Sequence, residues 1–245
     1  MKNTVAVVMA GAALSLVLLA PHQAKAQAAK AASSSIPRTP DGKPDLNGVW
    51  ERPYVPDMSR SGRGQEGPGT LPFTPEYAKI FKDYDPAKFD YTGNCLPQGL
   101  TRSINSPFPV RIVQTPQIVT ILYEAWMVFE IIPVNGKHQK EPDPLWAGEH
   151  IGFWDGDTFV VDSIAFNDKT NLDTVGHPHS DAMHTVERFT RTDDKHIAYE
   201  ITIEDSKAFT KSWKNTRTFT LRPDWEIMEY SCEENNKDAR EGHIK

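Results

Sequence analysis

The densest run of titratable side chains in the sequence lies in its last third. It contains three histidines, His177, His179 and His184, and these are followed by Glu187 and Arg188. Histidine is the side chain best suited to exchange protons near neutral pH, and a neighbouring carboxylate tunes its pKa. The run therefore favours an acid–base site in which His179 and His184 are catalytic and Glu187 orients one of them.

Two other interpretations of this run stay open. A zinc or copper ion could bind His177, His179 and His184, although H-x-H with a third histidine five residues later is not a specific metal motif. Alternatively, the histidines are exposed loop residues and Glu187 pairs with a neighbouring strand. We expect no organic cofactor, because the sequence has no glycine-rich nucleotide motif after a strand and no phosphate loop.

Further candidates lie in or beside segments rich in apolar residues. His150 is a third candidate acid or base, and Glu124 could orient a catalytic histidine. Four residues could bind the substrate by holding a planar aromatic ligand or by stabilising negative charge on it: Tyr123, Arg102, Trp126 and Trp154. For the aromatic residues among them, filling the core is the alternative role.

β-Strands must position these residues, because apolar and polar side chains alternate along most of the later chain. Ile197, Tyr199, Ile201 and Ile203, for example, share one face of a predicted strand. Short turns without intervening helices indicate an antiparallel meander. The predicted strands are 111–115, 117–125, 126–134, 151–154, 157–164, 184–191, 196–204, 215–221 and 225–232, with tight hairpin turns at Asn135-Gly136 and Asp155-Gly156.

About eight such strands can close a barrel around a small interior, and closure removes edge strands. The element Gly48-Val49-Trp50 is similar to the opening strand of lipocalin-like barrels, in which the tryptophan plugs one end. We therefore predict a mainly β, antiparallel, lipocalin-like (calycin-type) barrel, with a two-sheet sandwich as the alternative. One short N-terminal helix is expected, with Thr74 as its N-cap, Pro75 in its first turn and an end near Asp85-Pro86.

The first 26 residues have the composition of a cleavable signal peptide. Lys2 is followed by the apolar run Val5–Ala20 and by an A-x-A cleavage site at Ala24–Ala26. An uncleaved anchor is the alternative, but the run is shorter than the roughly 20 residues of a spanning helix. We expect a flexible linker at 27–40, a single barrel domain at 41–235 and a disordered tail at 236–245, in a protein that is exported to the periplasm or secreted.

The cysteine and charge content indicates a disulfide and limits the classes of molecule that the protein is expected to bind. In an oxidising compartment the even count of Cys95 and Cys232 predicts a disulfide, with two buried thiols or a metal pair as alternatives. A net charge of −6 with scattered signs argues against nucleic acid and anionic membranes. No membrane insertion is expected after signal cleavage. A small aromatic or apolar molecule is the expected partner, and a homo-oligomer is left open.

Residues 146–162, W-A-G-E-H-I-G-F-W-D-G-D-T-F-V-V-D, resemble the signature W-x-G-H-S-I-G-x-W-E-G-D-T-L-V-V-D of a large, mostly uncharacterised family of exported bacterial proteins. The resemblance implies cofactor-free lyase or decarboxylase chemistry on lignin-derived aromatics, with which some members are associated. The chain departs from the signature at Glu149-His150, where a one-residue shift in a strand moves the histidine to the opposite face. Further matching stretches are 40–50, 166–170, 179–181, 184–189 and 229–235.

Two functions are consistent with these patterns. The first is an exported lyase that decarboxylates, deformylates or eliminates from a small phenolic substrate by histidine and carboxylate chemistry. The second is a non-catalytic, lipocalin-like binding protein. An enzyme should place at least two titratable groups within hydrogen-bond reach inside the barrel, whereas a binder should have an almost wholly apolar interior.

Overall fold

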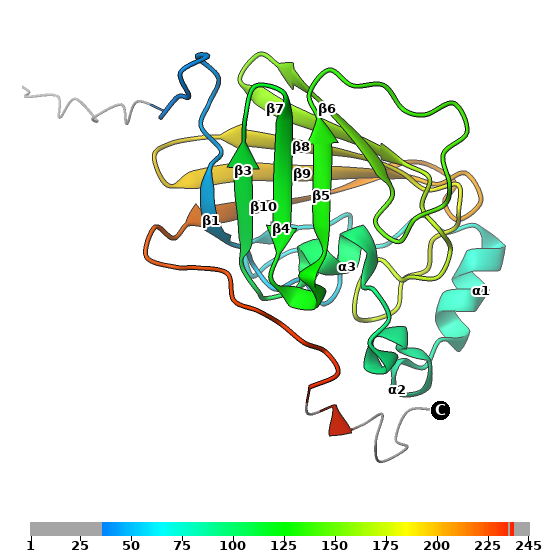
Figure 1. Cartoon of the computed structure of the whole chain (residues 1–245). Coiled ribbons are helices and arrows are strands. Elements are labelled where there is room, and N and C mark those ends of the chain that lie inside the picture. The colour runs from blue at the N-terminus through cyan, green and yellow to red at the C-terminus, as the bar shows by residue number, and fades with distance from the viewer. Residues whose placement is uncertain (1–35, 235, 238–245) are drawn as a thin grey trace, which may run out of the picture. The chain divides into compact units, whose positions relative to one another are not determined.

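A computed structural model describes residues 36–234 and 236–237 (Figure 1). The predicted signal peptide, most of the predicted linker and most of the predicted tail lie outside these residues. Within the described ranges, no helix has the length and apolar composition that crossing a bilayer would require. Arg38 donates to the Gly42 carbonyl and forms an ion pair of 2.5 Å with Asp157, so the last part of the predicted linker contacts the barrel.

Nine strands form one antiparallel path in the order β5-β4-β3-β1-β10-β9-β8-β7-β6, and a short tenth strand, β2, pairs with β10. The two ends of the path are joined by a single parallel bridge between Val134 and Gly152, which nearly closes the barrel. The predicted mainly β, lipocalin-like barrel is confirmed. The bounds are β1 Gly48–Glu51, β2 Gln65–Glu66, β3 Val110–Gln114, β4 Ile118–Tyr123, β5 Phe129–Pro133, β6 Glu149–Asp155, β7 Thr158–Ile164, β8 His184–Arg191, β9 His196–Glu204 and β10 Trp213–Leu221.

Period-two alternation sets which side chains enter the barrel. On β9 the predicted apolar face, which includes Ile197 and Tyr199, is fully buried. Trp50 is also fully buried, donates from its indole Nε1 to the Leu46 carbonyl at 2.9 Å, and lies under the guanidinium of Arg191 at 5.4 Å. Trp50 pairs with Leu221, the last residue of β10, and Arg191 is the last residue of β8. This pair therefore fills one end of the barrel.

Two predicted strand features are wrong. Asn135-Gly136 does not make a hairpin turn: Asn135 donates to the Gly152 carbonyl on β6, and a long loop then leads to β6. The predicted strand 225–232 is absent, because β10 already pairs with β1 and β2 on one edge and with β9 on the other. The second predicted hairpin is confirmed, since Asp155 pairs with Thr158 around a tight turn.

Three α-helices and two 3₁₀-helices accompany the barrel. The helix α1, Pro75–Asp83, follows Thr74 as predicted, whereas the others were not expected. Every residue of α3 is buried, and its last carbonyls accept hydrogen bonds from buried arginines described below. Part of the predicted strand 126–134 is instead 3₁₀-helical. The remaining bounds are α2 Pro86–Phe89, α3 Gly99–Asn105, η1 Tyr91–Asn94 and η2 Ala125–Met127.

The predicted disulfide between Cys95 and Cys232 is confirmed, with the two Cα atoms 5.5 Å apart. It ties the segment that follows β10 to the end of η1. Disulfides are typical of proteins that fold in an oxidising compartment, which agrees with the expected export.

Removing this disulfide should destabilise the protein. The bond closes a loop whose ends are 137 residues apart, so it removes much conformational entropy from the unfolded chain. We expect the double variant Cys95→Ser, Cys232→Ser to lose about 2–4 kcal/mol of unfolding free energy in urea titrations. Wild type held in reductant is the matched control and should behave like the variant. Equal stability of the oxidised wild type and the variant would contradict this prediction.

Candidate active site

Two carboxylates lie inside the barrel and are completely buried. Glu130 belongs to β5 and Glu187 to β8, and both have no exposed surface. Alternation explains their placement, because Phe129 and Ile131, the neighbours of Glu130 along β5, are exposed on the outer face. Burying a carboxylate is unfavourable unless polar partners compensate for the lost water, so the contacts of these two groups are informative.

Each carboxylate accepts one hydrogen bond from a buried tyrosine. The Tyr123 hydroxyl donates to Glu130 Oε1 at 2.5 Å, and the Tyr199 hydroxyl donates to Glu187 Oε1 at 2.8 Å. The second oxygen, Oε2, of both glutamates is buried without a hydrogen-bond partner among the described residues, as is the hydroxyl of Thr185 on the same face of β8. Buried polar atoms are rarely left unpaired, so these oxygens point to a bound proton or a ligand.

Two buried arginines accompany the tyrosines. The guanidinium of Arg52 lies 5.2 Å from the centre of the Tyr123 ring, and that of Arg217 lies 5.6 Å from the Tyr199 ring. Arg52 donates to the carbonyls of Ser103 and Ile104 at the end of α3. These cations favour negative charge in the interior, although neither forms an ion pair within 4 Å of a glutamate in the described chain.

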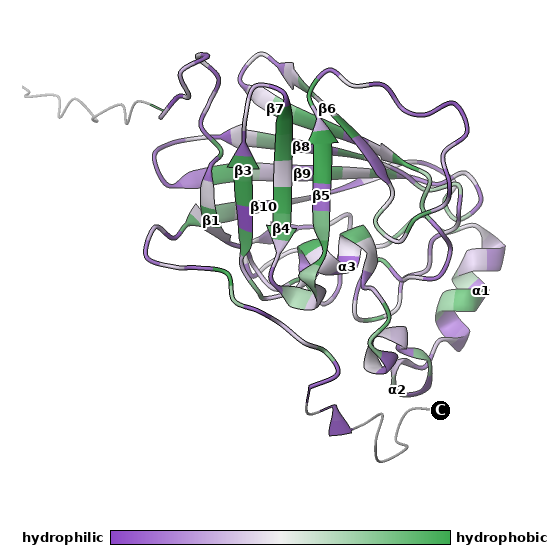
Figure 2. Ribbon diagram, viewed as in Figure 1, coloured by the Kyte–Doolittle hydropathy of each residue, from purple (hydrophilic) through white to green (hydrophobic). Residues whose placement is uncertain are grey.

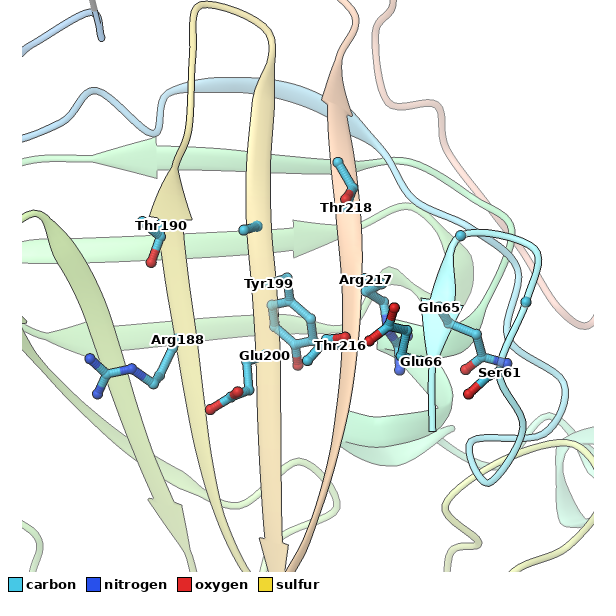
Figure 3. A pocket seen from close by; sticks show the side chains of 13 residues that line it. Ser61, Gln65, Glu66, Arg188, Thr190, Tyr199, Glu200, Thr216, Arg217 and Thr218 are labelled. Atoms are coloured by element: carbon cyan, nitrogen blue, oxygen red, sulfur yellow. The ribbon is translucent and has the colours of Figure 1, made fainter. Parts of the chain in front are cut away.

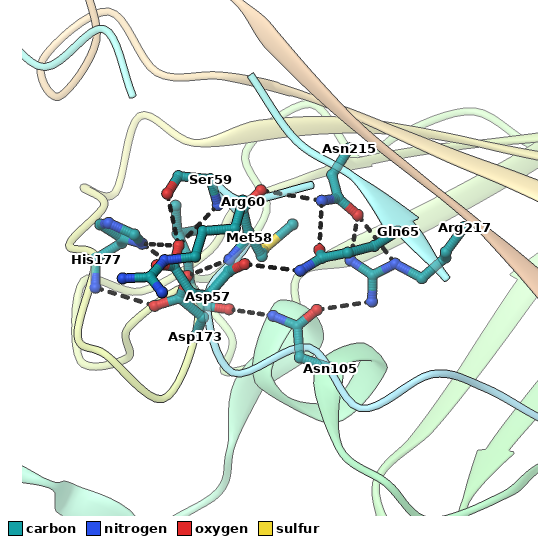
Figure 4. A network of polar contacts seen from close by, with 11 residues as sticks. Asp57, Met58, Ser59, Arg60, Gln65, Asn105, Asp173, His177, Asn215 and Arg217 are labelled. Atoms are coloured by element: carbon teal, nitrogen blue, oxygen red, sulfur yellow. Dashed lines mark hydrogen bonds and ion pairs between the residues drawn. The ribbon is translucent and has the colours of Figure 1, made fainter. Parts of the chain in front are cut away.

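A polar network holds Arg217 in place (Figure 4). Asn215 Oδ1 accepts from both Nε and Nη2 of Arg217, at 3.0 and 2.7 Å, and Asn105 Oδ1 accepts from Nη1 at 2.7 Å. The Asn215 amide in turn donates to the Met58 carbonyl and to the side chain of Gln65. Residues of a loop, of α3 and of β10 therefore hold the Arg217 guanidinium, and several acceptors set its plane and direction.

Burial changes the protonation of the interior groups. It raises the pKa of Glu187 to about 7 and the pKa of Glu130 well above its usual range, and the charge of Glu187 raises the latter further. The pKa values of Tyr123 and Tyr199 also lie well above normal, mainly because of burial. Burial therefore favours the protonated form of Glu130, while Glu187, whose pKa lies near neutral pH, can lose and regain a proton. Two carboxyl groups with different protonation states are a common acid–base pair.

His150 is the predicted histidine that reaches this interior. It points inward from β6, with Nδ1 2.8 Å from the Ser163 hydroxyl and 3.8 Å from Glu130 Oε2. Burial lowers its pKa to about 4, so the imidazole is neutral at physiological pH. The preceding Glu149 points outward and contacts His138, which agrees with the expected change of face at this position.

The interior beside the two tyrosines is tightly packed. A narrow space lies between Arg52, Tyr123, Tyr199 and apolar side chains, and no part of it is wide enough for a water molecule. The two glutamates do not line this space. A ligand therefore fits only if side chains or strands move. The apolar lining residues are Ile104, Val110, Ile112, Ile121, Phe189 and Phe219.

A more open groove of about 700 Å³ lies on the outer face of β8, β9 and β10, beside the loop at residues 61–66 (Figure 3). Two of its charged side chains are paired: Arg188 binds Asp155 at 2.7 Å and Glu200 binds Lys214 at 2.7 Å. The interior is the stronger candidate site, because that is where buried polar atoms lack partners.

Four predicted site residues lie away from the interior glutamates. Glu124 accepts a hydrogen bond from the Met228 amide, and Arg102 binds the Asp90 carboxylate. The rings of the two predicted tryptophans pack against other aromatic side chains, Trp126 on Tyr230 and Trp154 on Phe159.

The histidine run is not assembled into one site either. His177 Nδ1 lies 2.7 Å from Asp173 Oδ2, and His179 Nε2 lies 2.6 Å from the Thr170 hydroxyl. His184 is on the outer face of β8, with Nε2 2.9 Å from Asp162. Within the described chain, these three histidines do not lie close enough together to share one metal ion.

A group of Asp57, Asp173 and His177 does have ligand-type atoms within 4.8 Å of one another. Its carboxylate oxygens are already engaged by protein donors. Asp173 Oδ2 accepts from the Met58 amide at 2.8 Å, and Asp57 Oδ1 accepts from the amide and hydroxyl of Ser59 (Figure 4). These contacts join two loops and support the network that holds Arg217.

Four residues of the interior were not predicted as site residues from the sequence: Glu130, Tyr199, Arg52 and Arg217. One signal was present: Glu130 interrupts an otherwise apolar stretch, at a position whose neighbours must face the opposite way. A charged residue on the inward face of a predicted strand is the pattern that would have found it. Arg217 carries the same signal, because it shares a face with Phe219 in the predicted strand 215–221. Arg52 lacked such a signal, because its partners are backbone carbonyls at the end of α3.

The fold and this interior together define a lipocalin-like barrel with two buried tyrosine–glutamate pairs. Comparison of the chain with protein-family models and with curated proteins gave no match to either. The resemblance of residues 146–162 to the exported bacterial family therefore stays a prediction from the sequence.

Proposed function

We propose that the protein is an exported, cofactor-free lyase that acts on a small phenolic substrate of the lignin-derived type inside the barrel. The observation that carries this proposal is the pair of buried carboxylates, each held by a tyrosine through one oxygen and left without a partner at the other. A binding protein for apolar molecules would gain nothing from two buried acids, since each one must be desolvated.

Decarboxylation illustrates how these groups would act. Glu187, with a pKa of about 7, removes the phenolic proton. In a substrate of the 4-hydroxycinnamate type, the protonated Glu130 gives its proton to the alkene carbon that carries the carboxylate. The alkene π bond breaks and the phenolate electrons move through the ring, which gives a quinone methide. The carbon–carbon bond to that carboxylate then breaks and carbon dioxide leaves, while its electron pair restores the aromatic ring. The phenolate recovers its proton from Glu187, and Glu130 regains one from solvent.

The arginines support this chemistry electrostatically. Arg52 lines the narrow interior space, and Arg217 lies over the ring of Tyr199, which also lines it. These two positive charges would stabilise a phenolate and a substrate carboxylate, which are otherwise poorly solvated in the interior. Tyr123 and Tyr199 keep their protons, because their pKa values are raised, and so they act as hydrogen-bond donors. The neutral imidazole of His150 lies beside Glu130 and offers a route for its reprotonation.

Access would be easiest at the seam between β5 and β6. These strands share only the bridge from Val134 to Gly152 and the hydrogen bond from Asn135 to Gly152, whereas other neighbours on the path are joined by longer ladders. Separating them therefore breaks the fewest hydrogen bonds. Glu130 on β5 and His150 on β6 lie directly inside this seam.

Turnover of phenolic compounds tests the proposal. Purified protein is incubated with 4-hydroxyphenyl compounds that carry a carboxylate or a hydroxymethyl group, and mass spectrometry follows loss of carbon dioxide or formaldehyde. We expect Glu187→Gln and Glu130→Gln to lower turnover by about 100-fold, because each removes a proton-transfer group. Glu200→Gln is the matched control, since this glutamate is on the outer face of neighbouring β9, and it should keep wild-type activity.

The variants also separate the candidate functions. His150→Ala should reduce turnover, whereas His184→Ala should not, because His184 is outside the barrel. Turnover that survives in a folded Glu187→Gln variant would rule out this site. Saturable binding of the phenolics without any reaction would instead identify a non-catalytic, lipocalin-like binding protein.

A further inference from the structure

The outer surface of the barrel is divided between two kinds of face. On β8, β9 and β10 the outward side chains are mostly polar or charged, as expected for a sheet with one side in water. On β3, β4 and β5 the outward positions are mostly apolar. This second group, called here the apolar face, consists of Val113, Ile118, Leu122, Phe129, Ile131 and Pro133.

The residues of the apolar face are neighbours across the strands. Leu122 pairs with Phe129, Ile118 pairs with Pro133, and Thr120 lies between Val113 and Ile131. Phe129 is 59% exposed and Ile131 is 54% exposed. Figure 2 shows these three strands largely in green, and in Figure 1 the face is turned to the viewer with no other segment in front of it.

The exposed area is too large to be incidental. Together with the adjoining Met127, the exposed apolar side chains leave on the order of 500 Å² of apolar surface in water, at the upper end for a monomeric protein. Two such faces packed together would bury about 1,000 Å², which is the lower limit for a specific protein–protein interface.

The described segments near the C-terminus do not cover the apolar face. The segment after β10 contacts Trp126 and Glu124 beyond the end of β4, not the apolar face. Of the sequence outside the described residues, 27–35 and 238–245 contain one large apolar side chain, Ile244. The apolar run before residue 21 belongs to the predicted signal peptide. Within the described residues, no segment covers the apolar face.

From these observations we infer that the apolar face is the interface of a two-fold symmetric homodimer. Arg111, at the margin, is the single charged residue among the outward positions of β3, β4 and β5, so the face offers little charge complementarity to a charged partner. A second copy presents the same uncharged surface, and a two-fold axis brings like patches together. This inference does not rest on the proposed enzymatic function.

Light scattering coupled to size-exclusion chromatography tests the dimer at micromolar concentrations. The wild-type protein should have twice the mass of one chain, and Ile131→Glu and Phe129→Glu should each have the mass of one chain. Thr218→Glu, which places the same charge on the outer face of β10, is the matched control and should remain dimeric. Circular dichroism checks that the variants keep the barrel.

Three results would overturn the inference. The first is a monomeric wild type. The second is a dimer that persists in folded Ile131→Glu and Phe129→Glu variants, which would place the interface elsewhere. The third is a wild type that is monomeric and co-sediments with phosphatidylcholine vesicles while Ile131→Glu does not, which would assign the face to lipid.

Discussion

The Glu187→Gln variant should lack a pH-dependent contribution of about 3 kcal/mol to the free energy of unfolding. The reason is that the folded-state pKa of Glu187 is about 7, whereas its ordinary value is 4.5. The folded protein binds this proton more tightly than the unfolded chain does. The resulting stability is fully present below pH 4.5 and is lost as the pH rises through 7. Glutamine carries no proton to lose, so the free energy of unfolding of the variant should increase relative to that of the wild type as the pH rises.

Urea unfolding of both proteins from pH 5 to pH 8 measures this difference. The pKa of His150 is lowered to about 4, so its contribution is present above pH 6.5 and is lost as the pH falls towards 4, in both proteins alike. The difference between them therefore isolates Glu187. For Glu200→Gln, on the outer face of β9, the plot of unfolding free energy against pH should run parallel to that of the wild type. A Glu187→Gln curve that also runs parallel would show that Glu187 titrates normally.

The same pKa connects stability with the proposed chemistry. A base that is effective near neutral pH must be ionised there, and ionised Glu187 is the form that the interior disfavours. Turnover should therefore rise with pH over the range in which stability falls. A buried group that serves only to fill the barrel would not couple these two measurements.

The barrel was predictable because its signal is local. Inward and outward positions follow from alternation along each strand, and the structure places the candidates Tyr123, His150 and Glu187 on inward faces. Local pattern failed where tertiary context decides. Residues 225–232 were predicted as a strand but pair with no sheet edge, and α3 has a mixed sequence yet is buried on all sides.

The site was only partly predictable for a related reason. Titratable residues that are close in sequence, His177, His179 and His184, are separated by a loop that packs two of them against Asp173 and Thr170. The residues that do meet come from strands far apart in the chain, such as Glu130 and Glu187. Their proximity depends on the order in which nine strands pair, and no single segment contains that information.

Arg217→Met should destabilise the protein by about 3–5 kcal/mol, the usual effect of removing one partner from a buried set of charges. The substitution leaves Oδ1 of both Asn215 and Asn105 without its donor, and it removes the positive charge that lowers the pKa of Glu187. We therefore expect a second effect. The pH midpoint of the Glu187 contribution should move above 7 in the variant.

Two comparisons separate the charge of Arg217 from its hydrogen bonds. Arg217→Lys keeps the charge but lacks the planar fork that bonds Asn215 and Asn105, so it should lose stability while leaving the Glu187 midpoint near 7. In the double variant Arg217→Met, Glu187→Gln, the unpaired buried acid is gone, and the combined loss should be smaller than the sum of the two single losses by about 1–3 kcal/mol. Strict additivity would mean that the arginine and the glutamate do not interact, and the interior would then be a packing arrangement without the electrostatic pairing that acid–base chemistry requires.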